Sequence, residues 1–246
     1  MSLPDGFLDR PFAHRGLHDA AAGVPENSLA ALRAAIAEGY GVELDLQPSV
    51  EGEAMVFHDD DLERLTGEAG PVSARRAAEL GRTGLLGTAE TVPTLAAFLA
   101  ETAGRVPLLI ELKSQRDPGP LAARVAALLA DHDGPAAVMS FDPAMLHPLA
   151  QALPGVPRGL VSMADWDEVE GLTPERRSAL ARLEDLEAVG GSFASYRWSD
   201  LPTPETAALR ARGVPVLCWT VRSAEAAGAV APHADQITFE CFRPAG

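Results

Sequence analysis

The feature that most constrains the fold is a regular alternation of short apolar stretches with stretches of helical periodicity. The apolar stretches predict strands, and the segments between them, with apolar residues three or four positions apart, predict amphipathic helices. This alternation indicates parallel strands joined by helical crossovers. The predicted strands cover residues 11–14, 41–47, 54–57, 106–113, 136–141, 159–162, 192–195, 214–221 and 235–239.

The predicted strand at 54–57 differs from the others because only a short turn, with Gly52 as its flexible point, separates it from its predecessor. A turn of this length joins antiparallel strands. Without this short antiparallel excursion, eight strand–helix units remain in 246 residues, which is the size of a (β/α)₈ TIM barrel of the α/β class. No linker divides the chain, so we expect a single domain over residues 1–246, with residues 1–10 as a loose leader.

The composition excludes several partners and compartments. A formal net charge of −15 argues against nucleic acid and against stable association with an anionic membrane, because both are polyanions. The sequence has neither a signal peptide nor an uncharged apolar run long enough to span a bilayer, so we expect a cytoplasmic protein. The two cysteines, Cys218 and Cys241, lack metal-ligand spacing. The sequence does not indicate an oligomeric state.

Polar side chains gather at the carboxyl ends of the predicted strands, which is the end where barrels of this kind place their active sites. Acidic residues on an amphipathic strand are often simply solvated. A core that needs only stability, however, has no use for charges at several strand ends, so we favour a functional role. The candidate residues are His14, Arg15, Glu43, Asp45, His58, Glu111, Lys113 and Trp219.

The types of these residues suit cleavage of a phosphate diester. Glu43 and Asp45 share one face of a strand, and with Glu111 they offer an oxygen-rich site for Mg²⁺ or Ca²⁺. Arg15 and Lys113 can hold a phosphate against that cation.

Two histidines complete this set of groups. His14 and His58 can supply one general base and one general acid, which would move protons to and from the alcohol oxygens.

Six short motifs follow one another from about residue 11 to the end of the chain. They are His14-Arg15-Gly16, Pro25-Glu26-Asn27-Ser28, Glu43-Leu44-Asp45, Val56-Phe57-His58-Asp59, Glu111-Leu112-Lys113 and Trp219-Thr220-Val221. In order and spacing, most densely over residues 12–67, the chain resembles the glycerophosphodiester phosphodiesterase family. The resemblance implies a TIM barrel that hydrolyses small glycerophosphodiesters to sn-glycerol 3-phosphate and an alcohol with a divalent cation.

The resemblance also implies a role for each candidate residue. The catalytic histidines match His14 and His58, and the glycerol hydroxyl would attack phosphorus to give a cyclic phosphate that water opens. The order in which the two histidines act stays open. The metal carboxylates match Glu43, Asp45 and Glu111, and the substrate-binding residues match Arg15, Lys113 and Trp219.

The chain departs from the family pattern at two positions. Arg222 stands where the family usually has Asn, and Glu240 where the last strand usually ends in Asp. Arg222 could meet an anionic head group or simply lie on the surface. We interpret His18 as a rim residue, and Asn27 as a residue that either orients the site or caps the following helix.

Two other functions remain open. One is a lysophospholipase D or sphingomyelinase D-like activity on lipid phosphodiesters. The charged and small residues of segments 59–90 and 163–190 favour soluble diesters instead. The other is a barrel that binds phosphate or metal without turnover.

Overall fold

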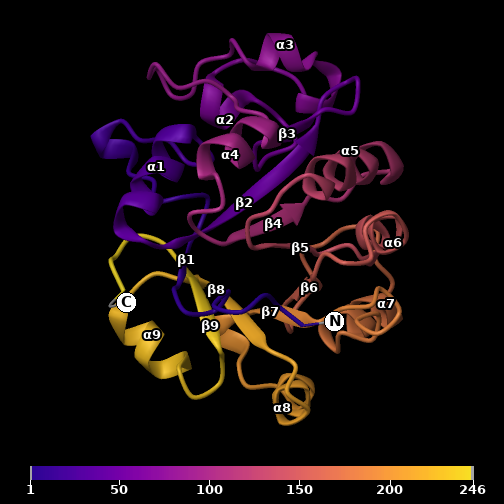
Figure 1. The fold of residues 1–246 in the computed structure, drawn as a ribbon. Helices are drawn as coiled ribbons and strands as arrows, with labels where there is room; N and C mark the ends of the chain where they lie inside the picture. The colour runs from indigo at the N-terminus through magenta and orange to yellow at the C-terminus, as the bar shows by residue number, and fades with distance from the viewer. Residues whose placement is uncertain (1, 245–246) are drawn as a thin grey trace.

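Eight parallel strands close into a barrel in the computed structural model of the chain, which describes residues 2–244 (Figure 1). Each strand pairs in parallel with its neighbours, and the pairing of β1 with both β2 and β9 closes the ring. The predicted TIM barrel is confirmed. The barrel strands are β1 (Phe12–Ala13), β2 (Gly41–Pro48), β4 (Leu108–Leu112), β5 (Ala136–Ser140), β6 (Arg158–Ser162), β7 (Phe193–Arg197), β8 (Val216–Val221) and β9 (Gln236–Phe239).

Helices cross over between successive barrel strands and cover the outside of the ring (Figure 1). Hydroxyl side chains fix where several of them begin, since Ser28 and Thr94 each accept a hydrogen bond from the first turn of a helix. No helix follows β9 within residues 2–244, so the last of the eight expected strand–helix units lacks its helix there. The crossover helices are α1 (Leu29–Glu38), α4 (Leu95–Thr102), α5 (Gly119–Ala130), α6 (Pro143–Ala152), α7 (Pro174–Ala181), α8 (Pro204–Ala211) and α9 (Ala224–Val230).

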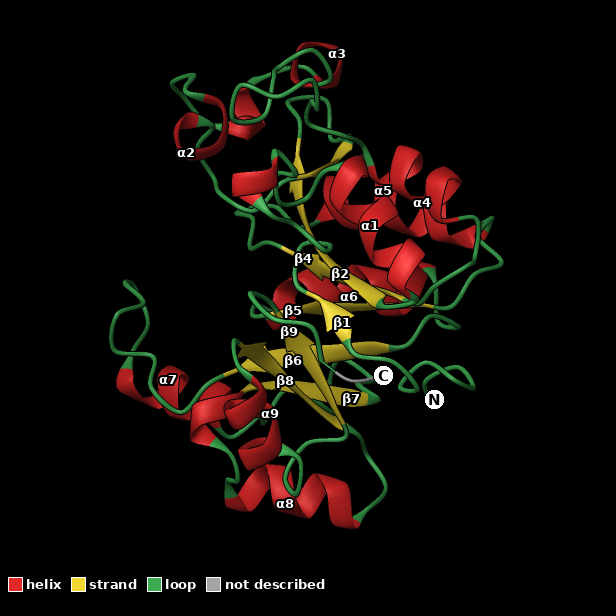
Figure 2. Ribbon diagram, turned by 90° about the vertical axis from the view of Figure 1, so that its left-hand side faces the viewer, coloured by secondary structure: helices red, strands yellow, loops and turns green. Residues whose placement is uncertain are grey.

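A small lobe interrupts the barrel after β2 and stands out at the top of Figures 1 and 2. It begins with β3 (Ala54–Val56), which pairs antiparallel with the end of β2 and so confirms the predicted excursion. Two short helices, α2 (Glu63–Thr66) and α3 (Ala77–Leu80), follow. The lobe has its own cluster of buried side chains: Met55, Phe57, Leu62, Leu65, Val72, Leu80, Leu85 and Val92.

Alternation along the strands divides the core into two layers. Val42, Leu44 and Leu46 pack among residues of the surrounding helices. Glu43 and Asp45 therefore face the inside of the barrel, where each is only 2% exposed. This burial overturns the alternative that they form a solvated face. The inner layer below them is apolar, and it comprises Phe12, Leu109, Ala137, Met139, Val161, Phe193 and Leu217.

The N-terminal segment packs against the barrel and is not loose, so that part of the prediction is wrong. Phe7 is 1% exposed, and its ring lies 5.2 Å from the ring of Phe12. The side-chain amide of Gln236 also donates to the carbonyl of Leu8 at 2.8 Å. In Figure 1 this indigo segment runs from β1 across the ring towards β7.

Two further findings concern the cysteines and the membrane. Cys218 is buried and Cys241 is exposed, and both are free thiols. Among the described residues, no helix combines the length and the apolar character needed to cross a membrane.

Candidate active site

All eight candidate residues line one cavity of about 230 Å³. Its walls come from the carboxyl ends of the strands, where His14 directly follows β1 and Lys113 directly follows β4. The prediction that these residues converge on one site is therefore met in the structure. The cavity is completed by Met139, Phe141, Val161, Thr220, Arg222 and Thr238.

Three carboxylates meet on neighbouring strands at the base of the cavity. Glu43 and Asp45 point inward from β2, and Asp45 stands opposite Glu111 of β4 in the parallel register. Each of the three residues can offer an oxygen within 4.8 Å of those of the other two. Because Glu111 is also buried, at 6% exposure, the site concentrates negative charge away from solvent.

Two protein cations lie against this carboxylate centre. The Lys113 ammonium is 2.7 Å from Asp45 Oδ1 and 2.5 Å from Glu111 Oε1. The Arg15 guanidinium lies 3.4 Å from Asp45 Oδ2 and is anchored by Glu26 at 2.6 Å. Burial alone would raise the pKa of Asp45, but Lys113, His58 and Arg15 bring that pKa well below its usual range.

Among residues 2–244, no lysine or arginine side chain forms an ion pair with Glu43. Its Oε2 accepts the backbone N–H of Arg15 at 3.0 Å and lies 4.0 Å from the His14 ring. Burial, and then repulsion from Asp45 and Glu111, raise the pKa of Glu43 well above 4.5. Three buried carboxyl groups whose oxygens approach within 4.8 Å of one another repel when ionised, and oxygen donors of this kind fit a hard divalent cation.

Asn27 orients this centre and does not cap the following helix. Its side-chain amide donates to Asp45 Oδ2 at 2.9 Å, and the residue is 1% exposed. Ser28 caps α1 instead, by accepting a hydrogen bond from the backbone N–H of Ala31. Of the two roles considered for Asn27 from the sequence, the structure therefore supports orientation.

His58 is held by the residue that follows it. Its Nδ1 lies 2.6 Å from Asp59 Oδ1, and Arg64 donates to the same carboxylate through Nε at 2.6 Å and Nη2 at 3.0 Å. Arg64 also binds Glu26, which links this group to Arg15. A run of three aspartates is typical of a solvated face, but Asp59, the first of the run after His58, is bound by the side chains of His58 and Arg64.

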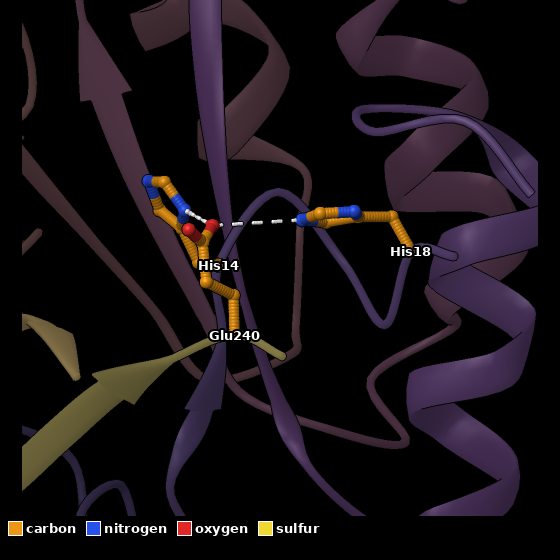
Figure 3. A group of neighbouring side chains, drawn as sticks. All are labelled: His14, His18 and Glu240. Atoms are coloured by element: carbon orange, nitrogen blue, oxygen red, sulfur yellow. Dashed lines mark hydrogen bonds and ion pairs between the residues drawn. The ribbon is translucent and has the colours of Figure 1, made fainter. Parts of the chain in front are cut away.

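His14 has an equivalent partner from the far end of the chain. Its Nδ1 lies 2.6 Å from Glu240 Oε2, and Figure 3 shows the Glu240 carboxylate between the rings of His14 and His18. The His18 Nε2 is 3.6 Å from the same oxygen. Arg222 donates to the other oxygen, Oε1, at 2.6 Å. His18 therefore lies beside the group around His14 without lining the cavity, which agrees with its interpretation as a rim residue.

These contacts determine which nitrogen of each imidazole carries the proton. The His14 hydrogen bond, then that of His18, lowers the pKa of Glu240, and the hydrogen bond from Arg64 lowers that of Asp59 despite its partial burial. An ionised carboxylate only accepts hydrogen bonds, so each Nδ1 must bear hydrogen. Each Nε2 is then left for proton transfer. Burial lowers the pKa of both histidines, while the hydrogen bond to the partner carboxylate acts in the opposite direction.

Comparison with known proteins shows several relatives. A putative glycerophosphodiester phosphodiesterase of Bacillus subtilis is 26% identical over 227 residues, which is 87% of each chain. An uncharacterized protein of Mycobacterium tuberculosis is 33% identical over 146 residues, 52% of this chain. The match spans 47% of the mycobacterial protein, so this chain corresponds to about half the length of that relative.

Solved structures give the same picture. A phosphodiesterase of Oleispira antarctica, in complex with the product sn-glycerol-3-phosphate, superposes with a TM-score of 0.79 at 25% identity and covers 97% of this chain and 93% of its own. A glycerophosphodiester phosphodiesterase of Agrobacterium tumefaciens gives a TM-score of 0.69 at 25% identity, over 94% and 95%. The family model matches residues 14–238, and the chain belongs to the glycerophosphoryl diester phosphodiesterase family.

Proposed function

We propose that this chain hydrolyses glycerophosphodiesters to sn-glycerol 3-phosphate and an alcohol. The observation that carries the proposal is the convergence of His14, His58 and three buried carboxylates on one cavity. Membership of the family supports it. So does the likeness to the Oleispira antarctica phosphodiesterase, which was solved with sn-glycerol-3-phosphate bound.

In this proposal Glu43, Asp45 and Glu111 hold a divalent cation, Mg²⁺ or Ca²⁺. The burial of Glu43 beside two other carboxylates, which raises its pKa, supports this role, as does the position of the Lys113 ammonium between those two carboxylates. When bound, the cation would polarise the phosphoryl oxygens and stabilise the charge that builds on them. Arg15 and Lys113 bind the phosphate from the protein side.

The two histidines move the protons. The Nε2 of a neutral histidine takes the proton of the glycerol hydroxyl as its oxygen attacks phosphorus, and the other histidine, which starts with hydrogen on both ring nitrogens, gives its Nε2 proton to the departing alcohol oxygen. A cyclic phosphate of glycerol results. Water then opens the ring with the two roles exchanged, which yields sn-glycerol 3-phosphate and returns both histidines to their starting states. Trp219, whose ring lies 5.2 Å from that of Phe141, forms an apolar wall for the substrate.

The direct test is release of glycerol 3-phosphate from glycerophosphocholine, measured with and without EDTA. We expect turnover that EDTA abolishes and that added Mg²⁺ or Ca²⁺ restores. Full activity in the chelator would remove the role of the cation. Tight metal binding without turnover on a panel of diesters with different alcohols would favour the barrel that binds without catalysis.

The raised pKa of Glu43 predicts how metal affinity depends on pH. A proton on this carboxylate must leave before the cation binds, so affinity should fall as the pH drops through the raised pKa. Titration calorimetry of Mg²⁺ or Ca²⁺ in buffers of different ionisation enthalpy measures the protons released. Glu43→Gln should remove most of the affinity and lower this release to the contribution of Glu111, whose pKa burial also raises. Release equal to that of the wild type in this variant would contradict the assignment.

One observation favours the lipid-active alternative. An apolar cavity of about 410 Å³ adjoins the candidate site and shares Phe141 with it. The segment 163–190, which had favoured soluble diesters because it is charged and small, supplies Met163, Trp166 and Val169 to this cavity. Including lysophosphatidylcholine in the panel therefore discriminates the two substrate classes.

A further inference from the structure

Three side chains stand in a row at one edge of the barrel. His14, Glu240 and Arg222 are the residues that directly follow β1, β9 and β8, which are neighbouring strands. Backbone hydrogen bonds fix the row, because His14 N–H donates to Phe239 O at 2.9 Å and Glu240 N–H donates to Val221 O at 3.0 Å. The strand register alone therefore brings the two departures from the family pattern, Arg222 and Glu240, beside a candidate catalytic histidine.

The Glu240 carboxylate is fully engaged within this row. Oε2 accepts from His14 Nδ1 at 2.6 Å, and Oε1 accepts from Arg222 Nε at 2.6 Å. The carboxylate is 14% exposed, so it exchanges little of this bonding for water. Figure 3 shows it directed at the His14 ring, with His18 on its other side. Each carboxylate oxygen thus accepts one hydrogen bond. Replacing either oxygen by an N–H group would place two donors against each other.

We propose that Glu240 is a positioning residue that fixes the ring orientation and the Nδ1–H tautomer of His14, and that Arg222 holds Glu240 in place. The proposal rests on the proposed function, in which His14 Nε2 transfers a proton. Arg222 is then neutralised by Glu240. It is not a free cation for an anionic head group, although it lines the cavity.

The Glu240→Gln variant gives a sharp test, because an amide has one acceptor and one donor where the carboxylate has two acceptors. With Arg222 present, the amide oxygen should face Arg222 and the amide nitrogen should face His14. The nitrogen would donate to Nδ1 and force the proton of the ring onto Nε2. We expect kcat to fall about 10- to 100-fold, the range known for carboxylate partners of metal-bound histidines, with KM nearly unchanged.

Removing the arginine as well should restore part of the activity. In the double variant of Arg222→Ala with Glu240→Gln, nothing holds the amide oxygen away from His14, so the amide can rotate and accept from Nδ1–H again. We expect the double variant to be more active than Glu240→Gln alone. The single variant Arg222→Ala keeps the carboxylate and should lose the least. A merely structural contact predicts the opposite, namely a double variant no better than the worse single one.

The tautomer itself is observable by ¹⁵N NMR of the imidazole nitrogens, with His14 assigned by comparison with His14→Gln. At a pH where the ring is neutral, the wild-type protein with Mg²⁺ should show hydrogen on Nδ1, and Glu240→Gln should show it on Nε2. The double variant should return to Nδ1. An unchanged tautomer in Glu240→Gln, or kcat within about twofold of wild type, would overturn the proposal.

The same strand offers a matched control. Asp235 precedes β9, at the end of that strand opposite Glu240, and it is bound by Arg210 at 2.9 Å. Asp235→Asn also removes an arginine-bound charge, but far from the cavity, so kcat and the His14 tautomer should not change. Circular dichroism verifies folding for each variant. If wild type fails to cleave any glycerophosphodiester, the proposed function fails, while the NMR comparison still decides the positioning of His14.

Discussion

The two histidines of the site are held in the same way by parts of the chain that differ in origin. In what we call the local pair, His58 binds Asp59, its neighbour in sequence. Arg64 of α2 donates to the same carboxylate. In the seam pair, His14 binds Glu240, 226 positions away, where the first and last strands meet. Both histidines thus end up with an Nδ1 bonded to a carboxylate that an arginine holds.

The difference teaches how each half of the site depends on the fold. The local pair needs only the lobe that follows β3, so it would keep its geometry if the barrel shifted slightly. The seam pair and the arginine that holds it, Arg222, directly follow three different strands. Their contacts form only when β1, β9 and β8 are in register. The hydrogen bond of His14 to its carboxylate therefore depends on closure of the barrel, whereas that of His58 does not.

The largest loss of kcat is expected when the histidine of either pair is removed. His14→Ala and His58→Ala should each lower kcat about 10²- to 10⁴-fold, the range that a proton-transferring side chain contributes. Circular dichroism should stay that of wild type. The measurement is glycerol 3-phosphate release from glycerophosphocholine at saturating substrate. His147→Ala, an exposed histidine on α6, is the control. Retention of full activity by either variant would remove that histidine from the mechanism.

A smaller effect is expected when the local pair loses its charge. In Asp59→Asn the amide cannot satisfy both His58 and the two Arg64 nitrogens as acceptors, so kcat should fall about 10- to 100-fold, comparable to Glu240→Gln. Asp61→Asn is the matched control, because Asp61 is an exposed aspartate of the same run. Equal kcat for the two aspartate variants would show that the local pair is dispensable and would break the parallel between the pairs.

The comparison also explains what the sequence could and could not predict. Glu43 and Asp45 were predicted because alternation along one strand is a local pattern, and the barrel followed from eight such patterns in order. Asp59 was adjacent to His58 but stood in a run of three aspartates, which is the usual composition of a solvated turn. Its contacts with His58 and Arg64 distinguish it from the rest of the run.

Glu240 illustrates a different limit. Its role depends on which strands are neighbours and on their register, and neither is written in any local stretch of sequence. The same holds for Phe7, whose burial depends on the open end of a barrel that forms far along the chain. Asn27 was interpreted correctly as one of two options, and only the position of Asp45 beside it decided between them.

The last and smallest expected effect assigns the two histidines their roles. Burial lowers the pKa of both rings, and the hydrogen bond to each partner carboxylate raises it again. Replacing Glu240 or Asp59 by its amide should therefore lower further the pKa of its own histidine. A general base must be neutral, so lowering its pKa moves the acid limb of the kcat/KM profile to lower pH. A general acid must be protonated, so lowering its pKa moves the alkaline limb to lower pH.

Profiles of kcat/KM against pH for Glu240→Gln and Asp59→Asn should thus shift on opposite limbs, and the limb that moves identifies the base. The charges of Asp45, Lys113 and Arg15 also shift the pKa of His58, but they are present in every variant and cancel in the comparison. Asp61→Asn should leave both limbs in place. If both variants moved the same limb of the pH profile, the two histidines would not be acting as one base and one acid. Because both histidines must act for the two protons to balance, that result would contradict the two-histidine mechanism while leaving the barrel and its carboxylate centre intact.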